Sequence, residues 1–263
     1  MDIFNFEPAA FLSLLLTLMR VSLVVFMLPV FSTDGLPNLW KFSISLVVTL
    51  AIWPKVALPG SAMPSHPFGI MLLLLGETLI GFTLGLATRF FFTAIQMGGE
   101  ILSFQMGFSM ITFADPSTGN NTGVLAYFLN MTATLVFLVM DGHLYLLKAF
   151  AETFAMLPAG GFAMSDSLMQ HVIRLSGTMF SFAIKVAAPV LVALFFVEMT
   201  MALMSRAAPQ MQIIQFSFPL KIAVGFFFLG ILFVIIGQET SHFITGLGSL
   251  MSNIIHSIRL GLR

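Results

Sequence analysis

The sequence predicts an all-α membrane protein built from long helices. Hydrophobic residues make up 58% of the 263 residues and charged residues only 8%, whereas soluble domains carry about 25% charged residues. Six almost uncharged apolar stretches fill the chain, and Arg20, Glu77, Lys185 and Glu198 lie inside them. A charge in hydrocarbon costs about 2.5–3.5 kcal/mol on insertion scales, so these side chains must face protein or water. We therefore expect helices that mostly contact other helices in a membrane assembly.

Composition also excludes several classes of protein. The chain has 11 basic and 11 acidic residues and a formal net charge of zero, which gives no indication of nucleic-acid binding. It has no cysteine, so disulfides, thiolate metal sites and iron–sulfur clusters are excluded. The chain opens with Asp2 and Glu7 rather than with a basic stretch. Because secretory signal peptides begin with a basic stretch, we expect the first apolar run to be retained.

The first two apolar runs differ in length. The first, 11–30, carries Ser13, Thr17 and Arg20 at helical spacing, which predicts one polar stripe on an apolar helix. In the second, only 12 residues separate Lys41 from Pro54. Such a helix would rise about 18 Å, well short of a hydrocarbon core of about 30 Å.

A long helix is expected over 68–108. Its first half places Glu77, Gly81 and Gly85 at four-residue spacing, and small residues at this interval let two membrane helices approach closely. We therefore place Glu77 in a helix contact. The second half carries a narrow polar line that suits a polar seam or a water-filled lumen; its members are Arg89, Thr93, Gln96, Glu100, Ser103 and Gly107.

The amino-acid composition changes over 106–123. This stretch is rich in Gly, Asn, Pro, Ser and Thr, which predicts a loop rather than a continued helix. Met106, Phe108, Met110 and Phe113 lie in the first part of this stretch, beside its polar residues. They are either ordinary core residues or a deformable seal, since thioether side chains adapt to irregular partners.

The rest of the chain predicts three more long runs. The run 124–140 ends at Asp141–Gly142, where helix can resume, and 158–161 is the best break between two halves. A helical hairpin follows, with a long helix to about Arg206, a turn around 208–209 and a second long helix.

No chemistry-bearing motif supports an enzyme. Glu239 and His242 have the spacing of a di-metal motif, but no second Glu-x-x-His is present. Nucleophile and phosphate-loop signatures are also missing. We therefore expect no catalytic, cofactor-binding or metal-binding residues. The embedded charges leave two interpretations, which are pairing with polar groups of neighbouring subunits and a proton or ion relay.

Two segments carry a resemblance to a known family. They are 99–109 (GEILSFQMGFS), followed by Asp115–Pro116, and 206–211 (RAAPQM), followed by 218–222 (FPLKI). With Arg20 in the first apolar run and Glu77, Gly81 and Gly85 in the long helix, they resemble FliR, the export-gate family of bacterial flagellar type III secretion and its injectisome counterparts. The similarity extends over essentially the whole chain.

The resemblance implies a fold and a function that composition does not. It implies a FliP-like N-terminal part, 1–160, fused to a FliQ-like C-terminal helical hairpin, 161–263, within a helical pore assembly. The function implied is that of a subunit that lines and plugs the channel through which unfolded flagellar proteins are secreted. The implied partners are FliP-like, FliQ-like, FlhB-like and FlhA-like components, and the implied location is the bacterial inner membrane, in the flagellar basal body.

The resemblance also assigns residues to roles. The plug or gate would comprise Met106, Gly107, Phe108, Ser109, Met110, Phe113, Asp115 and Pro116. Subunit-interface or buried-charge residues would be Arg20, Glu77, Gly81, Gly85, Glu100, Lys185, Arg206 and Lys221. Two alternatives remain open, which are a stand-alone secondary transporter or ion channel and a passive membrane scaffold.

Overall fold

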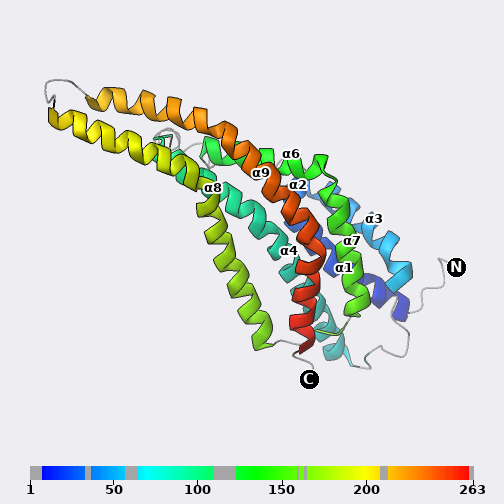
Figure 1. Cartoon of the computed structure of the whole chain (residues 1–263). Coiled ribbons are helices and arrows are strands. Elements are labelled where there is room, and N and C mark those ends of the chain that lie inside the picture. Colours follow the sequence, from blue (N-terminus) through cyan, green and yellow to red (C-terminus); the bar gives the residue numbers. More distant parts are fainter. Residues whose placement is uncertain are drawn as a thin grey trace. The chain divides into compact units, whose positions relative to one another are not determined.

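A computed structural model describes most of the chain as helices (Figure 1). The described residues are 8–32, 37–56, 64, 66–108, 123–158, 160–162, 165–207 and 213–260. Within these ranges there is no β-strand, and the predicted all-α fold is confirmed. The helices are α1 (Pro8–Met27), α2 (Pro29–Ser32), α3 (Asn38–Val56), α4 (Pro67–Gln105), α6 (Val124–Val139), α7 (Gly142–Met156), α8 (Asp166–Ala207) and α9 (Ile213–Leu260).

Four of the described helices are long and apolar enough to cross a membrane. They are α1, α4, α8 and the part of α9 from Gln215 to Arg259, and α6 with α7 adds a fifth candidate if the pair forms one broken span. The break falls at Asp141, which adopts a left-handed backbone with φ 56°. The sequence placed a helix end at this residue, and the structure confirms it.

The length predicted for the second helix is wrong. Pro54 does not end α3, because the helix begins at Asn38, includes this proline and continues to Val56. Proline removes its own N–H from the helical hydrogen bonds and its ring crowds the carbonyl four residues earlier, but only two residues of α3 follow Pro54. The 19 residues of α3 rise about 28 Å. Even so, α3 is not among the four described helices that are long and apolar enough to span.

The chain forms two compact units. The first unit contains Met1–Phe90, Asp141–Ser176 and Ile244–Arg263, and the second contains Phe91–Met140 and Gly177–Phe243. Helices α4, α8 and α9 each contribute residues to both units. These units are defined by which residues pack together, and they do not coincide with the division at 160/161. That division concerns the resemblance to FliP-like and FliQ-like parts, and it stays a prediction.

In the first unit, two glycines bring α4 against α1. A Cβ atom at Gly81 would lie 2.8 Å from the carbonyl oxygen of Arg20, and one at Gly85 would lie 2.9 Å from the Cβ of Met27. No larger residue fits at such separations without moving a neighbour. The predicted small-residue helix contact is confirmed, and it is a contact within one chain.

In the second unit, the C-terminal half of α4 contacts α6 and α8 in the same way. A Cβ atom at Gly99 would lie 2.5 Å from the Cα of Ala126 on α6. One at Gly98 would lie 2.9 Å from the carbonyl oxygen of Ala183 on α8. Small residues therefore let α4 approach three different helices along its length, once in the first unit and twice in the second.

Five phenylalanine rings form the aromatic core of the second unit. Phe91 stacks on Phe243 with ring centroids 4.1 Å apart and on Phe182 at 5.5 Å. Phe92 meets Phe137 and Phe243 edge-on. Such pairs contribute about 0.5–1.5 kcal/mol each beyond the area they bury, and these rings join α4, α6, α8 and α9.

We predict that Gly81→Ala destabilises the protein. The new methyl group meets the Arg20 backbone, which cannot rotate away as a side chain can, and overpacking of this kind costs about 1–3 kcal/mol. The measurement is thermal unfolding of the purified protein in detergent. Gly246→Ala is the matched control, because a Cβ at this helical glycine of the same unit has nothing within 4 Å. Equal melting temperatures for the two variants would contradict the close contact.

Candidate functional site

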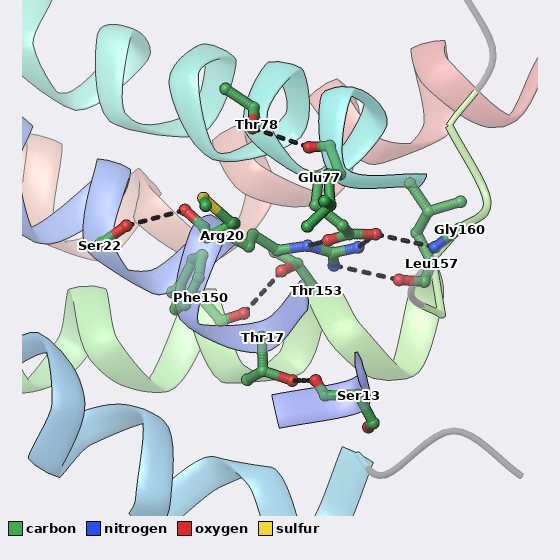
Figure 2. Close-up of polar contacts among 12 residues, drawn as sticks. Ser13, Thr17, Arg20, Ser22, Glu77, Thr78, Phe150, Thr153, Leu157 and Gly160 are labelled. Carbon is green, nitrogen blue, oxygen red and sulfur yellow. Dashed lines mark hydrogen bonds and ion pairs between the residues drawn. The ribbon is translucent and has the colours of Figure 1, made fainter. Parts of the chain in front are cut away.

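The first candidate site is a completely buried ion pair between α1 and α4. The side chains of Arg20 and Glu77 both have zero exposed surface. Arg20 Nε donates to Glu77 Oε2 at 2.5 Å, and Arg20 Nη2 donates to Glu77 Oε1 at 2.9 Å (Figure 2). Two parallel bonds of this kind fix the orientation of both side chains as well as their separation.

The pair also holds the chain that follows α7. Arg20 Nη1 donates to the carbonyl oxygen of Leu157 at 3.1 Å, and the backbone N–H of Gly160 donates to Glu77 Oε1 at 2.8 Å (Figure 2). The guanidinium lies over the ring of Phe154, with Arg20 Cζ 4.3 Å from its centroid, as in a cation–π contact. The ion pair therefore ties the segment after α7 to α1 and α4.

Sequence reasoning found the two charges but not this arrangement. One of its two interpretations placed their partners in neighbouring subunits and the other was a proton or ion relay, whereas the structure pairs Arg20 with Glu77 within one chain. Because Gly81 lies one turn from Glu77 and admits the α1 backbone, the carboxylate comes within reach of the guanidinium. The roles of Phe154, Leu157 and Gly160 were missed, since nothing in the sequence shows which backbone groups a buried arginine will bind.

The other polar groups of this region bond locally. Thr17 Oγ1 donates to the carbonyl oxygen of Ser13 at 2.8 Å, and Thr153 Oγ1 donates to that of Phe150 at 2.6 Å (Figure 2). Bonds of this kind to a preceding turn satisfy a hydroxyl without involving another helix. The polar stripe predicted on α1 is therefore buried, and its threonine bonds to its own helix.

The second candidate site is the C-terminal end of α4, in the second unit. Gly107 has φ 85°. The N–H of Phe108 donates to the carbonyl oxygen of Ser103 at 2.9 Å, and that of Gly107 donates to the carbonyl oxygen of Phe104 at 3.1 Å. This pair of bonds around a left-handed glycine is the Schellman helix end. It explains why α4 stops here and why Gly107 is a glycine.

The end of α4 packs on the N-terminal part of α9. Met106 is completely buried, and its side chain lies against Gly225. Gly107 lies against the ring of Phe218. The remaining plug or gate residues of the sequence analysis, Ser109, Met110, Phe113, Asp115 and Pro116, lie outside the described residues.

The other charged residues singled out in the sequence have different surroundings. Lys221 on α9 forms an ion pair with Glu198 on α8, with Nζ 2.5 Å from Oε1 and the side chains 20% and 41% exposed. This pair confirms that the two long helices lie side by side, as a hairpin requires. Glu100 is exposed and accepts a bond of 3.3 Å from Gln96. Lys185 and Arg206 are exposed, and no ionic partner for them is found among the described residues.

Metal-binding geometry is absent from the described part of the chain. No group of three or more His, Asp or Glu side chains in those ranges is placed to hold an ion. The completely buried Arg20 and Glu77 side chains instead bind each other. This geometry favours a role in holding helices together over a role in binding a ligand.

The fold and these sites define a class, an all-helical membrane protein whose buried charges join its own helices. The chain belongs to the family described as "Bacterial export proteins, family 1", whose model matches residues 11–247. This finding confirms the family resemblance seen in the sequence.

Sequence similarity to known proteins extends over nearly the whole chain. The chain is 31% identical over 243 residues to the "Flagellar biosynthetic protein FliR" of Escherichia coli (strain K12), covering 92% of each protein. It is 31% identical to the protein of that name from Pectobacterium carotovorum, covering 90% of each. For the Bacillus subtilis (strain 168) protein of that name, identity is 28%, with 86% of this chain and 89% of the relative covered.

We predict that breaking one half of the ion pair is worse than removing both halves. Arg20→Met leaves a buried carboxylate and Glu77→Leu leaves a buried guanidinium, and each should cost about 3–5 kcal/mol. The double variant replaces the pair with apolar side chains and should recover much of that loss. Thermal unfolding and yield of the purified protein report both effects.

Glu152→Gln is the control for this prediction, because Glu152 is an exposed carboxylate on α7 of the same unit. It should leave the melting temperature unchanged. If the single Arg20 and Glu77 variants match that control, the pair does not hold the helices together.

Proposed function

We propose that this chain is a subunit of the flagellar type III protein export gate, where it lines and plugs the channel for unfolded flagellar proteins. The observation that carries the proposal is the family match over 11–247. The names of the relatives, which share about nine-tenths of their length with this chain, supply the flagellar assignment. We propose a role in gated passage rather than in catalysis.

Unequal burial of the apolar helices supports membership of a larger assembly. The most apolar window of α1 is 44% buried inside the chain, whereas those of α8 and α9 are only 28% and 22% buried. Large apolar surfaces left open by the chain itself mark contacts with other proteins or with lipid. FliP-like and FliQ-like subunits are the proposed neighbours, with FlhA-like and FlhB-like components nearby in the bacterial inner membrane.

The plug is proposed to be the segment 106–123, called here the gate segment. Its described ends meet at one point on α4. The N–H of Phe108 bonds to the carbonyl oxygen of Ser103, and a Cβ atom at Gly123 would lie 2.7 Å from Ser103 Oγ. A chain that leaves and returns at the same residue can change its conformation without displacing α4 or α6, which is what a plug requires.

The alternatives receive less support. A stand-alone transporter or channel was suggested by charges inside apolar helices, but Arg20 and Glu77 are held by each other and by the backbone of two further residues. A proton relay needs a group that changes its charge during turnover, and this arrangement favours a permanent pair. A passive scaffold is distinguished from a gate by the experiments that follow.

We predict that deleting 109–121 opens the channel. Because Phe108 bonds to Ser103 and Gly123 lies against the same residue, the helices should still assemble with their partners. Membranes or proteoliposomes that contain the complex should then leak small solutes, measured as release of a trapped dye. Normal assembly with unchanged permeability would contradict the plug assignment.

We also predict that a photo-crosslinker at Phe113 traps an arrested secretion substrate. A substrate that passes the gate segment must come within reach of that position, whereas a scaffold would give no crosslink. Met106, another of the plug or gate residues expected from the sequence, is completely buried and is unsuited to a crosslinker. A crosslinker at the exposed Tyr145 of α7 in the first unit serves as the control. Equal yields at the two positions would count against a path past the gate segment.

A further inference from the structure

The C-terminal part of α9, drawn in red in Figure 1, exposes a face without apolar side chains. Between positions 244 and 259, every exposed residue is polar or glycine. The exposed residues that carry side chains, called here the polar line, are Thr245, Ser249, Asn253, His256 and Arg259. They recur every three or four residues and so share one helix face. From its first to its last member the line is about 21 Å long.

The large apolar side chains of the same stretch lie on its other face. Six of them are at most 5% exposed, and they are Ile244, Leu247, Met251, Ile254, Ile255 and Ile258. No large apolar side chain between 244 and 259 is exposed. Other helices of the first unit differ, because Phe11 on α1, Leu39 on α3 and Leu72 on α4 are each more than half exposed. The polar line is therefore a distinct surface of this unit.

The chemistry of the line favours water as its surroundings. The 48 residues of α9 rise about 72 Å, more than twice the thickness of a hydrocarbon core of about 30 Å, so much of this helix must lie outside lipid. Exposed phenylalanines such as Phe226 and Phe227 occur in its N-terminal part. Protein interfaces are anchored by large buried side chains, and the polar line offers none. It therefore suits neither lipid nor a tightly packed partner.

The same chemistry suits contact with an unfolded polypeptide. Such a chain exposes backbone N–H and C=O groups that need hydrogen-bond partners, and hydroxyl, amide and imidazole groups can both donate and accept. Ser249 Oγ donates to the carbonyl oxygen of Gly246 at 2.9 Å, which leaves its oxygen able to accept. Because water competes for the same bonds, each contact is weak. A line about 21 Å long accompanies about six residues of an extended chain.

We propose that the polar line is the surface of this chain that contacts the unfolded polypeptide during export. The proposal rests on the proposed export function and adds which face of the chain meets the substrate. A strongly charged line would retain segments of opposite charge, and an apolar line would retain apolar segments. Between Thr245 and His256 the line has no permanently charged side chain, so segments of mixed sequence can move along it.

Single cysteines test the proposal, because the chain has none of its own. Ser249→Cys and Asn253→Cys place a thiol on the polar line. Leu75→Cys is the control, at an exposed apolar position on α4 of the same unit. Complete export complexes in membranes are treated with a sulfonated methanethiosulfonate that does not cross lipid, and labelling is measured on this chain. In parallel, a bismaleimide is used to crosslink each thiol to a cysteine in an arrested flagellar substrate.

We expect labelling on the polar line to be about tenfold faster than at Leu75→Cys, because the reactive thiolate forms in water and is disfavoured in apolar surroundings. The arrested substrate should slow this labelling several-fold. It should also crosslink to Ser249→Cys and Asn253→Cys but not to Leu75→Cys.

Two results would overturn the proposal. Slow labelling at both positions of the line means that lipid or a partner covers this face. Fast labelling without a substrate crosslink means that the face meets water outside the export path. In either case the crosslinker at Phe113 decides the export function separately, since a substrate crosslink there leaves that function standing and its absence removes both. If one cysteine variant does not assemble, the other decides by the same criteria.

Discussion

The buried pair of Arg20 and Glu77 is the constraint on which the first unit depends. A guanidinium and a carboxylate removed from water are costly unless every strong donor and acceptor is used. Here the two side chains bind each other through two hydrogen bonds, and the backbone of Leu157 and Gly160 adds one further bond to each of them. Electrostatics therefore specifies which helices meet, and it fixes the chain that leads from α7 toward α8.

Close packing along α4 makes these contacts possible. Membrane helices gain little from burying apolar surface against one another, so close backbone contact and specific polar bonds decide which helices associate. Gly81 brings α1 within reach of the carboxylate one turn away, and Gly99 brings α6 onto the same helix farther along. Glycines thus set the contacts of α4 in each unit, although each unit has a different core.

The end of α4 connects packing with the proposed function. The helix ends where Gly107 adopts a left-handed backbone, and Met106 is held beside it by Gly225. These contacts are apolar, so they can form and break without uncovering a charge. The ion pair of the first unit is a completely buried, two-bond contact, whereas the contact at the end of α4 is apolar, which is compatible with the proposed plug function.

The sequence by itself determined the helical membrane fold, the break at Asp141, the long hairpin and the family, because these follow from composition, helical period, turn residues and motif letters. It also showed that Glu77 and Gly81 share a helix face. Only the tertiary structure decided which group pairs with Arg20, that α3 continues past Pro54, and that Met106 is covered by Gly225. Those outcomes depend on which helices are neighbours and how closely they approach, and helical periodicity gives the face of a residue but not its partner.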